Sequence, residues 1–261
     1  MEREAFLRRR AAAYQAYYEH MPLRPSSMPA GPDMRLYRRL AFGDLVELNV
    51  LDTRQYRSDQ VCGTVATRCD ASLDPAVTLT GAEQEAWLLE GTAASRARWN
   101  VIAQQVMMAQ LEVDPDPAVQ RFSHDQWDGY PLARRRILAH LAAADVSNPV
   151  VLAGDLHSAW VGDLKLDFDD PASAAVATEF VTTSVTSHNP YAAQVRFAPL
   201  LNPHLRYADA RHGYARMMVT PAEWRTEFRA IEDVSDPATP IETIATWIVE
   251  DGVPGAMSAE Q

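Results

Sequence analysis

The segment NPVVLAGDLHSAW, residues 148–160, predicts a buried strand that ends in a sharp turn. Four apolar residues follow Pro149, and a short apolar run between turn residues is typical of a strand buried on both faces. Gly154 allows the backbone to turn sharply, so Asp155 and His157 are expected in the loop just beyond the carboxyl end of the strand. Open α/β sheets bind their ligands at that edge.

Asp155 and His157 have two interpretations. A carboxylate and an imidazole two positions apart on such a loop can converge on one cation or on one phosphate. Alternatively, Asp155 caps the following turn and His157 makes only structural hydrogen bonds. An isolated Asp-x-His favours the second interpretation, and the flanking sequence reverses that preference.

Two earlier segments repeat the pattern of an apolar strand followed by polar side chains. Residues 45–51 predict an interior strand that leads into Asp52 and Arg54, and residues 99–103 predict a strand that leads to Gln105. Asp52 and the two arginines Arg54 and Arg57 can face an anion, or Asp52 and Arg54 can pair with each other and fasten the loop. A helix predicted from Pro131 onward connects to the strand at 149–153, which completes a βαβ unit. The side chains expected to cluster at one edge of the sheet are Asp52, Arg54, Gln105, Asp155 and His157.

Further elements are predicted along the rest of the chain. Helices are expected over residues 3–20 and, after a capping box of Thr80 and Glu83, to about residue 94. Strands are expected at 35–40, 162–168 and 175–181, and a hairpin at 213–219 and 223–231. Residues 202–211 show no regular pattern. One domain is expected over residues 1–250, followed by a flexible tail at 251–261.

Composition excludes several classes of function. The chain has 261 residues, of which 47% are hydrophobic, so it can bury a sizeable core. Its net charge of -11 and the lack of a basic stripe argue against nucleic acid as a partner. No apolar run is long enough to cross a bilayer. Adjacent arginines at positions 8–10 precede an aromatic and polar segment, so no export signal is expected.

The two cysteines, Cys62 and Cys69, lie in a segment rich in glycine, threonine and aspartate. Their spacing predicts a disulfide that closes a short loop, with the two Cα atoms within about 7 Å of each other. Such a bond would indicate an oxidising compartment. The alternative is a pair of reduced thiols, and the sequence does not separate the two.

Six segments, in this order, resemble those of a known family. They are residues 12–22 (AAYQAYYEHMP), 51–57 (LDTRQYR), 98–106 (RWNVIAQQV), 125–130 (DQWDGY), 152–158 (LAGDLHS) and 180–187 (FVTTSVTS). Together they resemble the alkaline phosphatase D (PhoD-like) family of calcineurin-type metallophosphatases, and they span nearly the whole chain.

This resemblance implies an α/β fold, the carboxyl-terminal half of a four-layer αββα sandwich, and a metal-dependent phosphomonoesterase or phosphodiesterase. It places His157 as a metal ligand, and Asp155 as a metal ligand or a catalytic group that orients His157. Arg54 is expected to act in catalysis by binding phosphate, because a guanidinium matches phosphate oxygens in pairs. Gln105 is a further candidate. The implied metals are calcium and iron, and the implied substrate is a phosphate ester.

The sequence departs from the family in the elements that hold most of the metal. An aspartate after the first strand, a Gly-Asp element with tyrosine and a Trp-Asp-Asp-His-Glu type element are not found in it. Because two-metal phosphoryl transfer needs ligands for both ions, we expect an inactive chain with an open half-site whose polar side chains lack partners. The alternatives are a non-catalytic binding or assembly module, and one half of a split enzyme that needs an amino-terminal partner. The family is usually exported, although this sequence shows no signal peptide.

Overall fold

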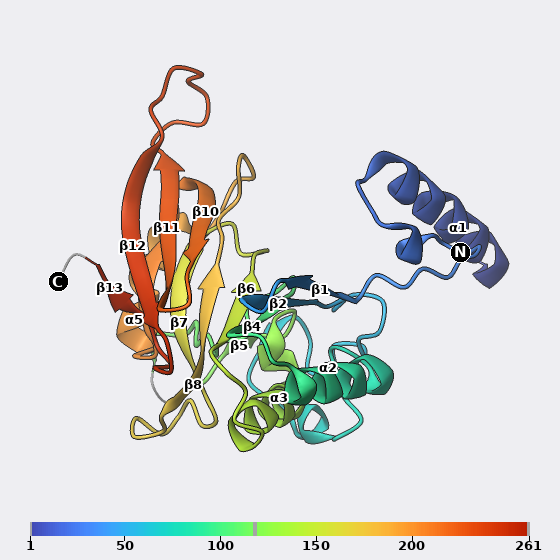
Figure 1. Cartoon of the computed structure of the whole chain (residues 1–261), viewed down its shortest axis with the longest axis horizontal. Coiled ribbons are helices and arrows are strands. Elements are labelled where there is room, and N and C mark those ends of the chain that lie inside the picture. Colours follow the sequence, from blue (N-terminus) through green and yellow to red (C-terminus); the bar gives the residue numbers. More distant parts are fainter. Residues whose placement is uncertain (1, 117–118, 260–261) are drawn as a thin grey trace. The chain divides into compact units, whose positions relative to one another are not determined.

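Four neighbouring parallel strands form the centre of the larger sheet in the computed structural model, which describes residues 2–116 and 119–259 (Figure 1). In spatial order they are β2 (Val46–Val50), β4 (Trp99–Ala103), β6 (Pro149–Ala153) and β8 (Ala175–Val181). β1 (Arg38–Phe42) lies beside β2. Beyond β8 come β7 (Ala159–Lys165) and β9 (Leu205–Asp209), which pair in the antiparallel sense.

Two helices connect the central strands. α2 (Ala82–Ala94) lies between β2 and β4 in the chain, and α3 (Pro131–Ala143) lies between β4 and β6. The register places Val101 opposite Val150, so the expected βαβ unit is confirmed. Because these strands are parallel, the loops that leave their carboxyl ends share one edge of the sheet.

A smaller antiparallel sheet contains the carboxyl-terminal strands. They are β10 (His212–Val219), β11 (Glu223–Ile231), β12 (Glu242–Glu250) and β13 (Met257–Ser258). The predicted hairpin is confirmed as β10 and β11, with Ala215 opposite Phe228. Short elements complete the described chain: β3 (Val65–Ala66) pairs with β5 (Phe122–Ser123), and the others are η1 (Pro25–Ser27), η2 (Asp70–Leu73), η3 (Trp127–Gly129), α4 (Ala192–Val195) and α5 (Ala198–Leu201).

Both faces of the larger sheet are buried, which explains the apolar runs of its strands. On β6, Val150 packs into a core between the two sheets, where Phe228 of β11 also lies. The next residue, Val151, faces the opposite way and packs with Ile137 and Leu138 of α3. The described chain therefore has a helix layer, a large mixed sheet and a second sheet. The α/β fold class predicted from the sequence is confirmed.

Residues 1–38 form a separate unit. Its helix α1 (Arg3–His20) has the predicted bounds, and Arg8 Nη1 lies 2.7 Å from Glu4 Oε1 one turn away. After η1, a bridge between Ala30 and Asp33 closes a turn. The second unit contains residues 39–261.

Two local predictions were wrong. Residues 202–211 were expected to be irregular, yet they contain β9, which the ion pair between Arg206 Nη2 and Asp163 Oδ2 of β7 (2.7 Å) fastens to the sheet. The polar residues of β9 had hidden its strand pattern. The predicted capping box was also wrong, because the residue that precedes α2 is Gly81 and not Thr80. Gly81 has a φ of 72°, which favours glycine, and no side chain caps the helix.

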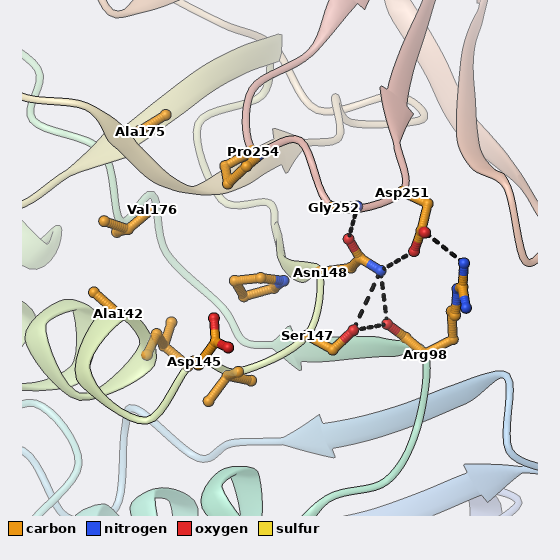
Figure 2. A pocket seen from close by; sticks show the side chains of 13 residues that line it. Arg98, Ala142, Asp145, Ser147, Asn148, Ala175, Val176, Asp251, Gly252 and Pro254 are labelled. Carbon is orange, nitrogen blue, oxygen red and sulfur yellow. Dashed lines mark hydrogen bonds and ion pairs between the residues drawn. The ribbon is translucent and has the colours of Figure 1, made fainter.

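The segment after β12, for which the sequence predicts a flexible tail, makes several contacts (Figure 2). Asp251 forms an ion pair with Arg98, and its Oδ1 accepts a hydrogen bond from Asn148 Nδ2 at 2.7 Å. The backbone N–H of Gly252 donates to Asn148 Oδ1 at 2.6 Å. Arg98 and Asn148 directly precede β4 and β6, so this network, beside a pocket of about 470 Å³, lies at the amino-terminal ends of the strands.

Candidate functional site

The loops at the carboxyl ends of β2 and β4 are joined through one glutamine. Gln105 Oε1 accepts hydrogen bonds from the backbone N–H of Thr53 (2.8 Å) and from Thr53 Oγ1 (2.7 Å). Gln105 Nε2 donates to the carbonyl of Leu51 at 2.9 Å. The carbonyl of Gln105 accepts from the N–H of Gly154, at the end of β6, at 3.2 Å. Gln105 therefore fixes the spacing of the three loops, and nothing in these contacts requires it to touch a substrate.

Asp52 shapes the loop after β2. Its buried carboxylate Oδ1 accepts hydrogen bonds from the backbone N–H groups of Arg54 and Gln55, each at 2.9 Å. This arrangement is an Asx turn, which aspartate forms readily. Asp52 thus binds the backbone of Arg54 and leaves its guanidinium to other partners.

The guanidinium of Arg54 lies between two carboxylates that come from distant parts of the chain. Its Nη1 is 3.1 Å from Asp125 Oδ1, and its Nη2 is 3.3 Å from Asp155 Oδ1. The side chain of Arg54 remains 42% exposed, so it lies at the surface and can exchange partners. The expected proximity of Arg54 to the Asp-x-His loop is therefore present.

The Asp-x-His loop has an unusual backbone. Asp155 and His157 have φ angles of 72° and 53°, in the left-handed region that non-glycine residues seldom adopt. Such conformations cluster at functional sites. Asp155 Oδ2 accepts a hydrogen bond from Gln126 Nε2 at 2.8 Å, so both of its carboxylate oxygens have partners.

The imidazole of His157 is oriented by a backbone carbonyl. Its Nδ1 lies 3.0 Å from the carbonyl oxygen of His188. Because a carbonyl only accepts, Nδ1 carries the proton, and Nε2 of the neutral ring keeps its lone pair. Histidines that bind metals commonly have this outer hydrogen bond. The orientation of His157 therefore suits a ligand role, and it equally suits the structural alternative.

Three polar residues of the site, Asp125, Gln60 and Gln126, were not identified from the sequence, whereas Arg57 was one of the two arginines expected to face an anion. Asp125 Oδ1 accepts from Arg57 Nη1 at 2.6 Å and from Gln60 Nε2 at 2.7 Å, in addition to Arg54. Gln126 is the partner of Asp155. The available signal was the segment 125–130, in which Asp125 opens a loop that leads into α3. The expectation that polar side chains here would lack partners was wrong for these residues, since they bond to one another.

The charges of this cluster nearly balance, because two arginines face two aspartates. Burial by itself raises the pKa of Asp125, but hydrogen bonds from Arg57 and Arg54 outweigh it and lower the pKa below its ordinary value. Asp125 is therefore ionised at neutral pH, and it accepts three donors on one oxygen.

A buried carboxylate on β8 also supports the site. Glu179 of β8 is fully buried and accepts the backbone N–H groups of Met108 (2.6 Å) and Ala109 (2.7 Å). These residues belong to the buried segment that follows Gln105. Burial raises the pKa of Glu179 to about 7, against the effect of the two N–H donors. Glu179 thereby anchors the loop that carries Gln105.

The described residues do not fit a two-metal centre. Within residues 2–116 and 119–259, no group of three or more histidine, cysteine, aspartate or glutamate side chains is arranged to hold a metal ion. Asp155 and His157 supply two candidate ligands, and both oxygens of Asp155 are hydrogen-bonded to protein groups.

Within residues 2–116 and 119–259, no helix combines the length and apolar character that a membrane span requires.

The parallel strands and the polar cluster at their carboxyl ends define an α/β protein with its candidate site at the sheet edge. The model of the PhoD-like phosphatase family matches residues 1–228. Alkaline phosphatase D of Bacillus subtilis (strain 168) is 43% identical over 251 residues, which are 95% of this chain and 43% of that protein. The solved structure of PhoD superposes with a TM-score of 0.91 at 41% identity, covering 99% of this chain and 50% of the other.

The chain belongs to the PhoD-like phosphatase family, so the resemblance to this family seen in the sequence is confirmed. It spans about half the length of the relatives that it matches.

Proposed function

We propose that this chain takes part in the hydrolysis of phosphate esters. The observation that carries the proposal is the contact between Arg54 and Asp155. It brings a group suited to phosphate oxygens next to the carboxylate of the Asp-x-His loop, in a chain of a phosphatase family.

Arg54 is proposed as the phosphate-binding group. A guanidinium offers two parallel N–H donors, and a positioned arginine neutralises the charge that develops on a transferring phosphoryl group. Arg54 is exposed enough to receive such a group, and a phosphate would replace Asp155 as one of its partners.

Asp155 and His157 are proposed as ligands of a metal ion, with calcium and iron as the metals. The imidazole Nε2 of His157 and the carboxylate of Asp155 have the right chemistry, but two ligands do not make a complete site. We propose that further ligands come from a part of the protein outside this chain, consistent with relatives twice as long. The chain would then act as the carboxyl-terminal half of the catalytic sandwich.

An exported location is part of the same proposal. Cys62 and Cys69 form a disulfide with a Cα–Cα distance of 5.7 Å, as the sequence predicted. Disulfides persist in oxidising compartments, which supports export of the protein.

A second candidate is a non-catalytic binding or assembly module. It is favoured by the lack of a three-ligand group in the described residues and by the balance of charges around Arg54. The phosphoesterase and the binding module predict different results for a protein extended to the length of its relatives. Such a protein hydrolyses phosphate esters under the first proposal and does not under the second.

The test measures hydrolysis of p-nitrophenyl phosphate and of its bis-ester. The 261-residue chain with added Ca²⁺, Fe³⁺, Mn²⁺ or Zn²⁺ is expected to show no significant activity, because it lacks ligands for two ions. A protein extended to the length of its relatives is expected to be active, and His157→Ala in it should reduce turnover by at least about 100-fold.

Two results would contradict this proposal. Metal-dependent turnover by the short chain, lost in His157→Ala, would show that it contains further ligands. An extended protein that folds and binds metal but shows no turnover would favour the binding module.

A further inference from the structure

We propose that Asp125 is a positioning residue that holds the guanidinium groups of Arg54 and Arg57 in place for a phosphate ester. This inference rests on the proposed function and adds a residue to the site. Asp125 lies in the loop before α3, 71 positions after Arg54 in the sequence, so only the fold brings the two together.

The geometry around Asp125 is convergent. Three donors, Arg54 Nη1, Arg57 Nη1 and Gln60 Nε2, meet on the single oxygen Oδ1 at 3.1, 2.6 and 2.7 Å. All three residues belong to the one loop that follows β2. Asp125 therefore gathers the donor groups of this loop from the opposite side of the site.

The two arginines are held differently. Arg57 is more buried, with 24% of its side chain exposed, and Asp125 is its closest acidic partner at 2.6 Å. Arg54 is 42% exposed and is shared between Asp125 and Asp155. If Arg54 leaves Asp155 for a phosphate, Asp125 still holds its other nitrogen. The contact with Asp125 thus keeps Arg54 near the site while its second nitrogen changes partner.

The residue next to Asp125 completes the arrangement. Gln126 is buried, donates to Asp155 Oδ2 at 2.8 Å, and accepts the N–H of Met107 on its Oε1 at 2.7 Å. Adjacent residues thus hold the two sides of the candidate site: Asp125 holds the arginines and Gln126 holds Asp155. Their peptide link fixes the distance between these sides, which is the precision that a reactive site needs.

Substitution of Asp125 distinguishes its role in positioning the two guanidiniums from the effect of its charge on phosphate binding. Asp125→Asn has nearly the same shape but loses the negative charge, which weakens its bonds to both guanidiniums. Arg54 would then be held mainly by Asp155, where it is less available to phosphate. Phosphate affinity is therefore expected to fall by about fivefold to tenfold, although the net charge of the variant is one unit less negative than that of the wild type.

The experiment follows the arginine side-chain N–H signals of the ¹⁵N-labelled 261-residue chain by NMR during titration with inorganic phosphate. Arg54→Lys and Arg57→Lys assign the signals. In the wild type, the Arg54 signal is expected to shift on phosphate addition, and both guanidiniums are expected to rotate slowly. Asp125→Asn should speed the rotation and weaken the titration, and Asp125→Glu, which restores a carboxylate, should recover part of both.

Asp59→Asn is the matched control. Asp59 is exposed and lies in the same loop as Arg57. Asp59→Asn changes the charge by the same amount as Asp125→Asn, but Asp59 makes no hydrogen bond to Arg54 or Arg57, unlike Asp125. It should leave rotation and affinity at wild-type values.

The outcomes separate this inference from the proposed function. If the wild-type Arg54 signal does not respond to phosphate, the phosphate-binding role falls and the inference falls with it. If Arg54→Lys weakens binding but Asp125→Asn does not, or if Asp59→Asn acts as strongly as Asp125→Asn, the inference alone is overturned. If Asp125→Asn weakens binding and Asp125→Glu restores part of it, the inference is supported.

Discussion

At the scale of single residues, local sequence predicted which side chains follow strands but not which side chains they meet. Asp155, Arg54 and Gln105 each follow an apolar run, and parallel strands bring such positions to one edge. Asp125 follows a two-residue strand, β5, outside the main sheet, so no periodic pattern marked it. Its partner Arg54 is 71 positions away, and such long-range contacts depend on the whole topology.

Glu179 gives a residue-scale prediction about pH. Its pKa is raised from an ordinary value of 4.5 to about 7 in the folded chain, because burial disfavours the charged form. Its stabilising contribution is therefore fully present below pH 4.5 and is lost as the pH rises to about 7. The free energy of unfolding should fall by about 3 kcal/mol across this range on account of this group.

Urea unfolding at several pH values measures this effect. Glu179→Gln should flatten the fall between pH 4.5 and 7, whereas Glu242→Gln, at an exposed position of β12, should not. A pH dependence identical in wild type and Glu179→Gln would show that Glu179 does not titrate in this range.

At the scale of elements, the sequence predicted several strands and helices from local pattern and turn residues. The hairpin strand β11 matches because its buried and half-buried positions alternate with a period of two, and β6 matches because it is a short apolar run between turn residues. α1 has the predicted bounds although none of its residues is buried. β9 was not predicted, because Arg206 and Asp209 interrupt its apolar residues. β12 was also not predicted, although its sequence ETIATWIVE is rich in the β-branched residues that favour strands. The start of α2 differed because Gly81, not Thr80, adopts the conformation that precedes the helix.

The disulfide loop gives an element-scale prediction. Cys62 and Cys69 are seven positions apart, and closing so short a loop restricts the unfolded chain. The double variant Cys62→Ser/Cys69→Ser should lower the free energy of unfolding by about 2–3 kcal/mol. Urea unfolding of the variant, and of the wild type with and without a reductant, measures this. Equal midpoints for the oxidised wild type and the variant would contradict the prediction.

At the scale of the whole molecule, the residue pattern predicted a βαβ unit, whereas the α/β class and its layers were what the family resemblance implied. Residues such as Val150 and Val151 are both apolar, so the sequence does not tell which sheet face each one occupies. The ends of the larger unit were also hard to predict. Residues 251–259 contain a short strand and a polar network, features that leave little periodic signal.

Removal of this carboxyl-terminal segment gives a whole-molecule prediction. A chain that ends at Glu250 loses β13, the ion pair of Asp251 with Arg98, and the hydrogen bond between Gly252 and Asn148. Its Tm should fall by more than about 5 °C, since about 1 kcal/mol corresponds to 2–4 °C in a chain of this size. A chain that ends at Ala259 is the matched control and should keep the wild-type Tm. An unchanged Tm in the shorter chain would favour the flexible tail expected from the sequence.

The contact of Arg54 with Asp155 has a consequence for how sensitive the site is to anions. The carboxylate is a tethered competitor, always present at a high effective concentration. The apparent affinity for any external anion is the intrinsic affinity scaled by the fraction of time that Arg54 is released. An anion that makes one weak contact therefore binds poorly, because Asp155 competes with it for Arg54. A ligand binds in spite of this competition if it also contacts Arg57, or if it brings a cation that Asp155 can bind instead of Arg54. Selectivity at this site would then come from the internal carboxylate as much as from the arginine.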